Sequence, residues 1–421
     1  MGTDVKIAST YFDTPVGTPP VSKDVTIPDL GWTPKAAMFF GSSLTYIAAP
    51  WHPSSPSIGW TDGTRQAAIA TYNQDNVSTS VCKHCGSTSS CILKITNALT
   101  VEGVFDSFIE NGVRLSFTTA GAATYVGVIF FGGDDFQAYA DKVAVGASLD
   151  VTAPGFRPSA VFALGKIADF GGSGSILNTA WLGFGFAADD GSDPPPQRCV
   201  SWGFGNGMTG QASSAQYVSS DEIVALPNIS GGTVNFAHQV DTFDANGFTF
   251  TRTTGSSTRY IAYLAIDLGD FEANIIEAAV PSSTTPQAIS GFGFAPTNFV
   301  TLSSDHATLD TVVTTDDARS VTSGWGYFDS SASWHMCNSG QIDANPTNSN
   351  YSIQMAKVVQ IMDLNLGEEA AATVFTWDAD GVTLSWSPGT SLVPKVFYLG
   401  MESQPAPVEG GTGLPVQAVI G

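Results

Sequence analysis

The sequence of 421 residues is poor in charged side chains, and its basic residues are few. Only 13% of the residues are charged, and 16 Lys and Arg face 38 Asp and Glu. The formal net charge of −22 would repel a phosphate backbone, so we expect no nucleic-acid partner.

Long hydrophobic runs are also missing. No stretch approaches the roughly 18 consecutive apolar residues that a membrane helix needs. The first residues, Met1 to Asp4, lack the basic and apolar regions of a secretory signal. We therefore expect no membrane insertion and a protein made in the cytoplasm without a signal peptide.

Helical periodicity is scarce, whereas turn-forming and aromatic residues are plentiful. The chain has 44 Gly and 23 Pro, and 11% of its residues are aromatic. This composition is typical of an all-β protein with many turns. The length predicts two to four domains, because a single small core would not bury so long a chain.

An internal repeat sets the number of domains at three. Each copy begins with an aromatic residue and a proline before an apolar run, at Trp32–Pro34, Phe156–Pro158 and Phe294–Pro296. A glycine-aromatic strand follows, at Gly59-Trp60, Gly183–Phe186 and Gly324–Tyr327. The order of these blocks is the same in all three copies, so we expect three diverged versions of one unit.

A third block in each copy predicts a tight hairpin. Asn-Gly or Asp-Gly stands between apolar strands, and both residues are expected at the turn with positive φ. The predicted turn residues are Asn111, Gly112, Asn246, Gly247, Asp380 and Gly381. Alternation of apolar and polar residues after each glycine predicts strands with one buried face.

The sequence therefore predicts three tandem antiparallel β-sandwich or jelly-roll-like domains with extended arms at both ends. The expected boundaries are an N-terminal arm at 1–30, repeats at 31–148, 149–272 and 273–402 (the last with its linker), and a C-terminal arm at 403–421. Both arms are rich in Pro, Gly and small polar residues. We expect them to lie on this chain or on a neighbouring copy as added strands, and so to drive oligomer formation.

Cys82, His84, Cys85 and Cys91 form a cluster with some features of a metal site. Thiolate and imidazole are zinc ligands, but the set is crowded into ten residues without a distant second pair. A disulfide is a second interpretation, with Cys91 bonded to Cys82 or Cys85. Loop thiols outside any disulfide are the third interpretation, which we favour.

No motif predicts catalysis or a cofactor. The carboxylates near the hairpins, among them Asp244 and Asp378, are explained by the turns. The loop with Asp189, Asp190 and Asp193 is a weak calcium candidate. A pair of carboxylates that cleaves a glycosidic bond can come from any two positions, and nothing in the sequence selects one. We expect a protein that is not an enzyme.

Aromatic residues in variable segments are the remaining binding candidates. Trp51, His52, Tyr72, Trp334 and His335 stand near polar groups. A solvent-facing ring beside acidic or amide groups can stack on a sugar. The competing interpretation is that these rings fill the ends of the sandwiches or the contacts between subunits.

The repeat resembles one found in virion proteins of tailed bacteriophages, of the tail-fibre and decoration type. The likeness rests on aromatic-x-Pro, the Gly-aromatic-Gly strand, Phe243–Thr249 and Tyr260–Leu264, and it covers nearly residues 31–400. A weaker similarity is to H-type lectins, whose sugar-binding residues have no match here.

The resemblance implies a structural protein on the virion exterior, as a tail or fibre component or a capsid decoration protein. Its expected partners are other virion proteins and further copies of itself. Three units in one chain would imitate a trimer on a symmetry axis of the particle. The alternative function is a glycan-binding adhesin that recognises a sugar on the host surface.

Overall fold

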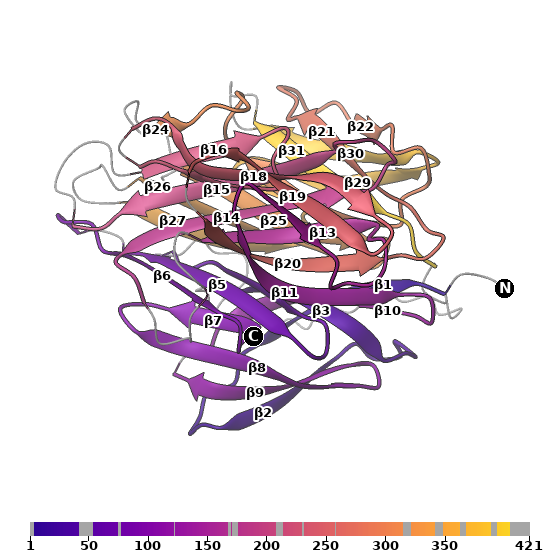
Figure 1. Cartoon of the computed structure of the whole chain (residues 1–421), viewed down its shortest axis with the longest axis horizontal. Helices are drawn as coiled ribbons and strands as arrows, with labels where there is room; N and C mark the ends of the chain where they lie inside the picture. Colours follow the sequence, from indigo (N-terminus) through magenta and orange to yellow (C-terminus); the bar gives the residue numbers. More distant parts are fainter. Residues whose placement is uncertain are drawn as a thin grey trace.

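The computed structural model describes residues 4–41, 54–74, 77–121, 123–166, 170, 176–207, 214–229, 231–256, 258–314, 321–341, 348–362, 368–388 and 394–404. All regular elements in these ranges are β-strands, and every pairing between them is antiparallel. The predicted all-β class with tandem sandwich units is confirmed (Figure 1).

The chain folds into three units of one topology, each with a six-stranded sheet and a four-stranded sheet. We define unit 1 as residues 4–134, unit 2 as 135–269 and unit 3 as 270–404. In unit 1 the sheet orders are β1-β10-β3-β4-β5-β6 and β2-β9-β8-β7, and the corresponding strands of the other units pair in the same way.

The strands of unit 1 are β1 (Lys6–Asp13), β2 (Val21–Thr26), β3 (Pro34–Gly41), β4 (Ser57–Thr61), β5 (Gln66–Asn73), β6 (Cys82–Ser87), β7 (Ile92–Ile95), β8 (Leu99–Ile109), β9 (Gly112–Ala120) and β10 (Tyr125–Gly132). Those of unit 2 are β11 (Gln137–Val145), β12 (Ser148–Val151), β13 (Ala160–Lys166), β14 (Thr179–Ala188), β15 (Gln197–Gly205), β16 (Ser214–Ser219), β17 (Val224–Pro227), β18 (Val234–Asp244), β19 (Gly247–Thr254) and β20 (Arg259–Asp267).

Unit 3 contains β21 (Ala273–Ala279), β22 (Gln287–Ser290), β23 (Asn298–Ser304), β24 (Val313–Thr314), β25 (Val321–Asp329), β26 (Ser333–Gln341), β27 (Asn348–Met355), β28 (Val359–Met362), β29 (Glu368–Asp378), β30 (Gly381–Pro388) and β31 (Lys395–Met401). The short β24 leaves its own unit and pairs with β16, so that it extends the large sheet of unit 2 to seven strands.

The pairing of the first two strands confirms that the N-terminal segment lies on its own chain as added strands, and it corrects the placement of residues 1–30 outside the first unit. β1 pairs with β10 along its whole length, and β2 pairs with β9, so residues 6–26 are integral strands of unit 1. In the same way β11 and β12 belong to unit 2, and the boundary between these units lies near residue 135 rather than 148. The expected C-terminal arm, apart from Ser403 and Gln404, lies outside the described residues.

The three predicted hairpins are present, but their glycines are the first strand residues after the loop rather than loop residues. Each two-residue loop ends before the glycine, because Ile109 pairs with Gly112, Asp244 with Gly247 and Asp378 with Gly381. The predicted positive φ is found at one residue of each pair: Asn111 at 67°, Gly247 at 159° and Gly381 at 152°.

Close approach of a neighbouring strand explains why glycine recurs. A Cβ on Gly112, Gly247 or Gly381 would lie 1.9, 1.8 or 1.9 Å from a backbone carbonyl oxygen of the strand alongside. The oxygens belong to Val25, Val151 and Ile289. Glycine is therefore required in every copy for the small sheet to pair at this point.

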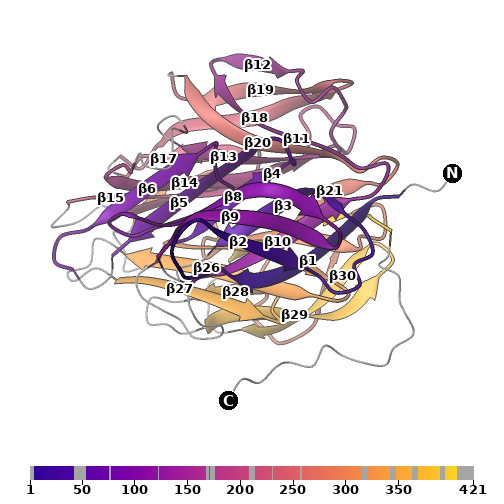
Figure 2. The same ribbon diagram turned by 90° about the horizontal axis from the view of Figure 1, so that it is seen from below.

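Both faces of each large sheet are buried. On β3, Phe39 points into the sandwich of unit 1, whereas Met38 and Phe40 point to the opposite face. That opposite face packs on the large sheets of the other two units. The four-stranded sheets lie at the periphery, as Figure 2 shows for β12, β19 and β18 of unit 2 on one side and β28 and β29 of unit 3 on the other.

One shared core joins the three units. Phe40 of unit 1 contacts Phe184 of unit 2, with ring centroids 6.0 Å apart, and Trp334 of unit 3 at 5.3 Å. Trp202 of unit 2 stacks on Trp325 of unit 3 at 5.6 Å with an interplanar angle of 5°. The chain is therefore a single-chain, trimer-like body around a common apolar centre.

The two ends of the described chain meet beside this core. The backbone N–H of Gln404 donates to the carbonyl oxygen of Val5 at 2.9 Å. The other two links are continuous polypeptide: residues 133–136 join units 1 and 2, and residues 268–272 join units 2 and 3. The third link is thus a hydrogen bond where the other two are covalent.

Candidate functional site

Three of the five side chains expected to stack on a sugar lie in the interior. Tyr72 on β5 is 6% exposed, Trp334 on β26 is 1% exposed, and His335 is fully buried. A sugar can stack only on a ring face that it can reach, so the prediction for these residues is corrected. Trp51 and His52 lie outside the described residues.

Trp334 is a packing residue between units 1 and 3. A Cβ on Gly127 would lie 3.0 Å from the indole, so the missing side chain of Gly127 lets the ring lie directly on β10. The indole also lies 6.3 Å from the ring of Tyr327 in its own unit. The ring therefore contributes to the shared core.

His335 is a neutral acceptor inside the sandwich of unit 3. The backbone N–H of Gln360 donates to its Nδ1 at 3.2 Å. Burial lowers the pKa of His335 to about 3, so the ring is uncharged near neutral pH. Its role is to satisfy a buried backbone donor.

The cysteine cluster does not form a metal centre. Cys82, Cys85 and Cys91 enter three different clusters of buried side chains, and the cysteines form no disulfide. Burial raises the pKa of the Cys85 thiol to about 11 and those of Cys82 and Cys91 further, so the three side chains are neutral thiols. Among the described residues, their sulfur atoms and the His84 ring form no group close enough to share a metal ion.

His84 is held by unit 2 rather than by a metal. Its Nδ1 contacts the carbonyl oxygen of Thr179, and its backbone pairs with Leu177. Burial lowers the pKa of His84 to about 4. The zinc and disulfide interpretations of this segment are therefore corrected, and the segment is a contact between units 1 and 2.

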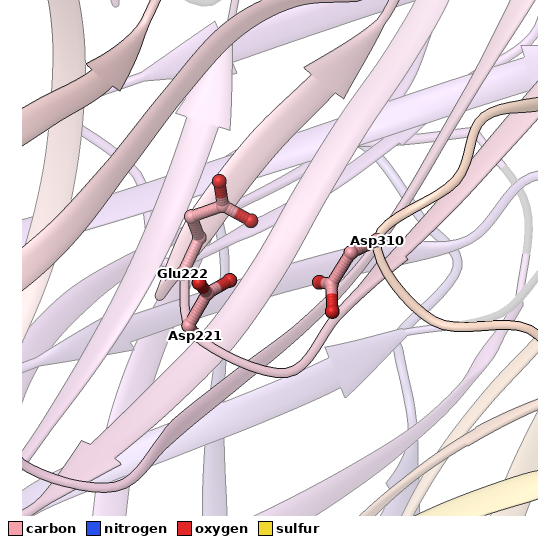
Figure 3. A group of neighbouring side chains, drawn as sticks. All are labelled: Asp221, Glu222 and Asp310. Carbon is pink, nitrogen blue, oxygen red and sulfur yellow. The ribbon is translucent and has the colours of Figure 1, made fainter.

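Among the described residues, one group of carboxylates comes close enough to share a cation. Asp221 and Glu222 follow β16, and Asp310 comes from the loop of unit 3 that leads to β24 (Figure 3). One ligand atom from each lies within 4.8 Å of the others.

Internal hydrogen bonds account for this acidic cluster. Ser219 Oγ lies 3.1 Å from Asp221 Oδ1 and from Asp310 Oδ1, and Ser220 N–H donates to Asp310 at 2.9 Å. Tyr217 donates to Glu222 at 2.9 Å, and burial raises the pKa of Glu222. The cluster fastens the loop of unit 3 to unit 2.

The loop proposed as a calcium candidate is also occupied by protein donors. Arg157 Nη2 donates to Asp189 Oδ1 at 3.0 Å, and Ser192 N–H donates to Asp190 at 2.9 Å. These contacts make a turn held by an ion pair.

A groove with an aromatic side chain in its wall lies between units 3 and 1. One cavity of about 300 Å³ is lined by Trp377, Asp329, Asp378 and the loop before β23. A second, of about 520 Å³, continues along β1 to Trp32. Both include Ile7, Ala8, Ser331 and Gln404, so they form one groove.

At the equivalent junction between units 1 and 2, larger side chains are in contact. Asp62 Oδ2 accepts a hydrogen bond from Ala140 N–H at 2.9 Å, and the Arg65 guanidinium lies 4.0 Å from the centre of the Tyr139 ring. Strand register places Ala8 where unit 2 has Tyr139. In unit 1, Ala8 pairs with Phe130, which pairs with Ala37 of β3. In unit 2, Tyr139 pairs with Ala265, which pairs with Val161 at the corresponding position of β13.

The hairpin supplies the second small residue. Asp329 Oδ1 accepts from the N–H groups of Ser331 and Ala332, as Asp62 Oδ1 does from those of Thr64 and Arg65. Ala332 therefore occupies the place of Arg65. Two alanines therefore stand where the junction between units 1 and 2 has a stacked Arg and Tyr, and one of them, Ala8, lines both cavities of the groove.

The junction between units 2 and 3 is different again. Its cavity of about 390 Å³ is lined mainly by charged and small residues, including Asp267, Asp270 and Glu272. Phe271 is its aromatic residue, and it packs on the shared core. The three junctions have thus diverged although the fold of the units is the same.

Sequence reasoning missed Trp377 as a site residue. It was part of the hairpin block, where its partners in the other units are Phe108 and Phe243. The signal available was the larger, amphipathic ring at one of three equivalent positions. Its place beside a groove depends on how units 3 and 1 meet, which the hairpin pattern does not encode.

No protein-family model matches this chain. No curated protein matches it either. Among solved structures, a fructofuranosidase variant from Schwanniomyces occidentalis in complex with fructosylnystose aligns over 90% of this chain and 97% of its own, with 8% sequence identity and a TM-score of 0.15. A likeness of that size supports no argument about fold or chemistry. In the described part of the chain, no helix is long and apolar enough to cross a membrane.

Proposed function

We propose that this chain is a non-enzymatic structural protein on the exterior of a tailed-phage virion, as a tail or fibre component or a capsid decoration protein. The observation that carries the proposal is the shared core, which makes three equivalent units into one prebuilt trimer-like block. Such a block matches a site of threefold symmetry with a single chain. The sequence resemblance to virion repeat proteins supports the same role.

Assembly in this proposal depends on the C-terminal segment. The N-terminal strands are used inside unit 1, so they are not available as an arm. Residues 405–421 follow Gln404, which lies at the junction of units 3 and 1. We assign contacts with other virion proteins, and with further copies of this chain, to that segment.

The test compares the full chain with a chain that ends at Gln404. Light scattering gives the mass of each, and negative-stain electron microscopy gives the shape. The full chain is expected to form rings, lattices or other oligomers, and the shortened chain is expected to stay a folded three-lobed monomer. If both remain monomers at the same concentrations, assembly through this segment is refuted.

Glycan recognition on a host surface is the second candidate function. The groove between units 3 and 1 favours it, because it combines an aromatic wall with carboxylates and hydroxyls. A virion appendage can hold both roles, since the groove and the shared core are separate features.

A further inference from the structure

We propose that the groove between units 3 and 1 binds a neutral oligosaccharide, with the Trp377 indole as the stacking surface and Asp378 as a hydrogen-bond acceptor. The inference names the site of the second candidate function and rests on it. The structural role does not depend on it.

Trp377 is fixed in place on one side and lines the groove. Its ring centroid lies 5.7 Å from that of Phe299 and 5.9 Å from that of Phe328, both in the sandwich of unit 3. The side chain is partly buried, and it also lines the smaller cavity. A ring held by its neighbours loses little conformational freedom on binding, which favours stacking against the apolar face of a sugar.

Asp378 has acceptor capacity left for a ligand. It accepts from Thr376 Oγ1 at 3.1 Å and from Thr383 Oγ1 at 2.7 Å, which position the carboxylate at the end of β29. An ionised carboxylate has about four lone-pair sites, so two contacts leave room for two sugar hydroxyls. Hydrogen bonds from a hydroxyl to a carboxylate are stronger than those between neutral groups.

The charge of the groove selects against acidic sugars. Asp329 and Asp378 line the smaller cavity, and neither Lys nor Arg does. Lys6 is the basic residue of the larger cavity, and its Nζ lies 3.2 Å from Asp4 Oδ1. With a formal net charge of −22 on the chain, a sialylated or uronic saccharide would meet repulsion without a compensating cation.

The dimensions favour more than one sugar ring. The two adjoining cavities, of about 300 and 520 Å³, fall in the range of small-molecule sites, and their lining runs from Trp377 along β1 to Trp32. A chain of sugars that lies in such a groove contacts both units. At the junction between units 1 and 2, Arg65 stacks on Tyr139 where units 3 and 1 have Ala332 and Ala8, so we expect one site per chain.

The first experiment screens the full chain against a printed array of neutral and sialylated oligosaccharides. Calorimetry with the strongest neutral oligosaccharide then gives the affinity and the number of sites. We expect binding to at least one neutral oligosaccharide with one site per chain.

Two variants block the groove. Ala8→Tyr introduces the residue that fills the junction between units 1 and 2, and Ser331→Tyr adds a ring from an exposed hairpin position on the same rim. Each folded variant is expected to lose at least about tenfold in affinity. Having two variants keeps the test valid if Ala8→Tyr does not fold.

A matched pair tests the carboxylate. Asp378→Asn is expected to weaken binding about tenfold, since it removes a charged acceptor. Asp244→Asn is the control, because Asp244 accepts from Thr242 and Thr249 in unit 2 as Asp378 does from two threonines in unit 3. The control is expected to bind as the unaltered chain does.

The proposal is overturned if no neutral oligosaccharide binds, if only acidic ones bind, or if binding survives both blocking variants. Equal losses for Asp378→Asn and Asp244→Asn would also contradict it. Oligomer formation is measured on the same proteins, so failure of the groove and failure of the structural role give different results.

Discussion

Replacing Trp334 with alanine tests whether the three units share one core. The indole is 1% exposed, packs against Phe40 of unit 1 and lies directly on the backbone of Gly127. Removing it leaves a cavity between two units that neither can close alone. Truncation of a buried Trp to Ala costs about 3–5 kcal/mol, a large part of the roughly 5–15 kcal/mol that stabilises a typical protein.

The assay is urea denaturation followed by far-ultraviolet circular dichroism and tryptophan fluorescence. Because the cavity lies in the shared core, we expect a single transition whose midpoint falls by the lost free energy divided by the denaturant slope. Phe375→Ala is the control in the same unit, since Phe375 is 61% exposed on β29. Its expected effect is within about 0.5 kcal/mol.

Two results would refute the reasoning. The first is an effect of Trp334→Ala as small as that of Phe375→Ala. The second is a separate transition in which unit 3 unfolds while units 1 and 2 keep their strands. Either result would mean that the aromatic contacts between units contribute little to stability.

Three further predictions concern Gly381, His335 and the cysteines. Gly381→Ala should destabilise by about 1–3 kcal/mol because its Cβ would meet the Ile289 carbonyl oxygen, whereas Gly146→Ala, with open space around it, should have little effect in the same denaturation assay. The pKa of His335 is about 3 when folded and near 6.5 when unfolded, so the unfolded state takes up this proton first as pH falls. The free energy of unfolding should therefore drop between about pH 6.5 and pH 3, and His335→Gln should make that drop shallower; an unchanged slope would contradict the assignment. The five buried cysteines should resist a thiol reagent in the native protein and all react in guanidinium chloride, and a reductant should leave the melting temperature unchanged.

The sequence predicts the strands and the threefold repeat because both depend on local patterns. Alternating residues after Gly112, Gly247 and Gly381 mark half-buried strands, and the structure has β9, β19 and β30 there. The first two strands of each unit are harder to find. β2, for example, has one fully buried residue, Val25, so its pattern resembles that of a solvated arm.

The candidate site was not predictable to the same degree, because burial between units is not local information. Trp334 stands next to a histidine in a strand, and the sequence cannot tell whether the ring faces solvent, its own sandwich or another unit. The groove is less visible still, because Ala8, which lines it, and Ala332 on the neighbouring hairpin are two small residues far apart in the chain. It becomes apparent only when their counterparts Tyr139 and Arg65 are seen in contact.

Fusion of the three units into one polypeptide changes how their junctions can evolve. In an assembly of three identical chains, a substitution at the interface appears three times, so a hollow opened at one contact is opened at all. In this chain each junction is formed by different residues of one sequence, so it can change independently of the other two. One can be sealed by Arg65 and Tyr139, another lined with charge and the third left hollow, while the common centre keeps the whole body stable.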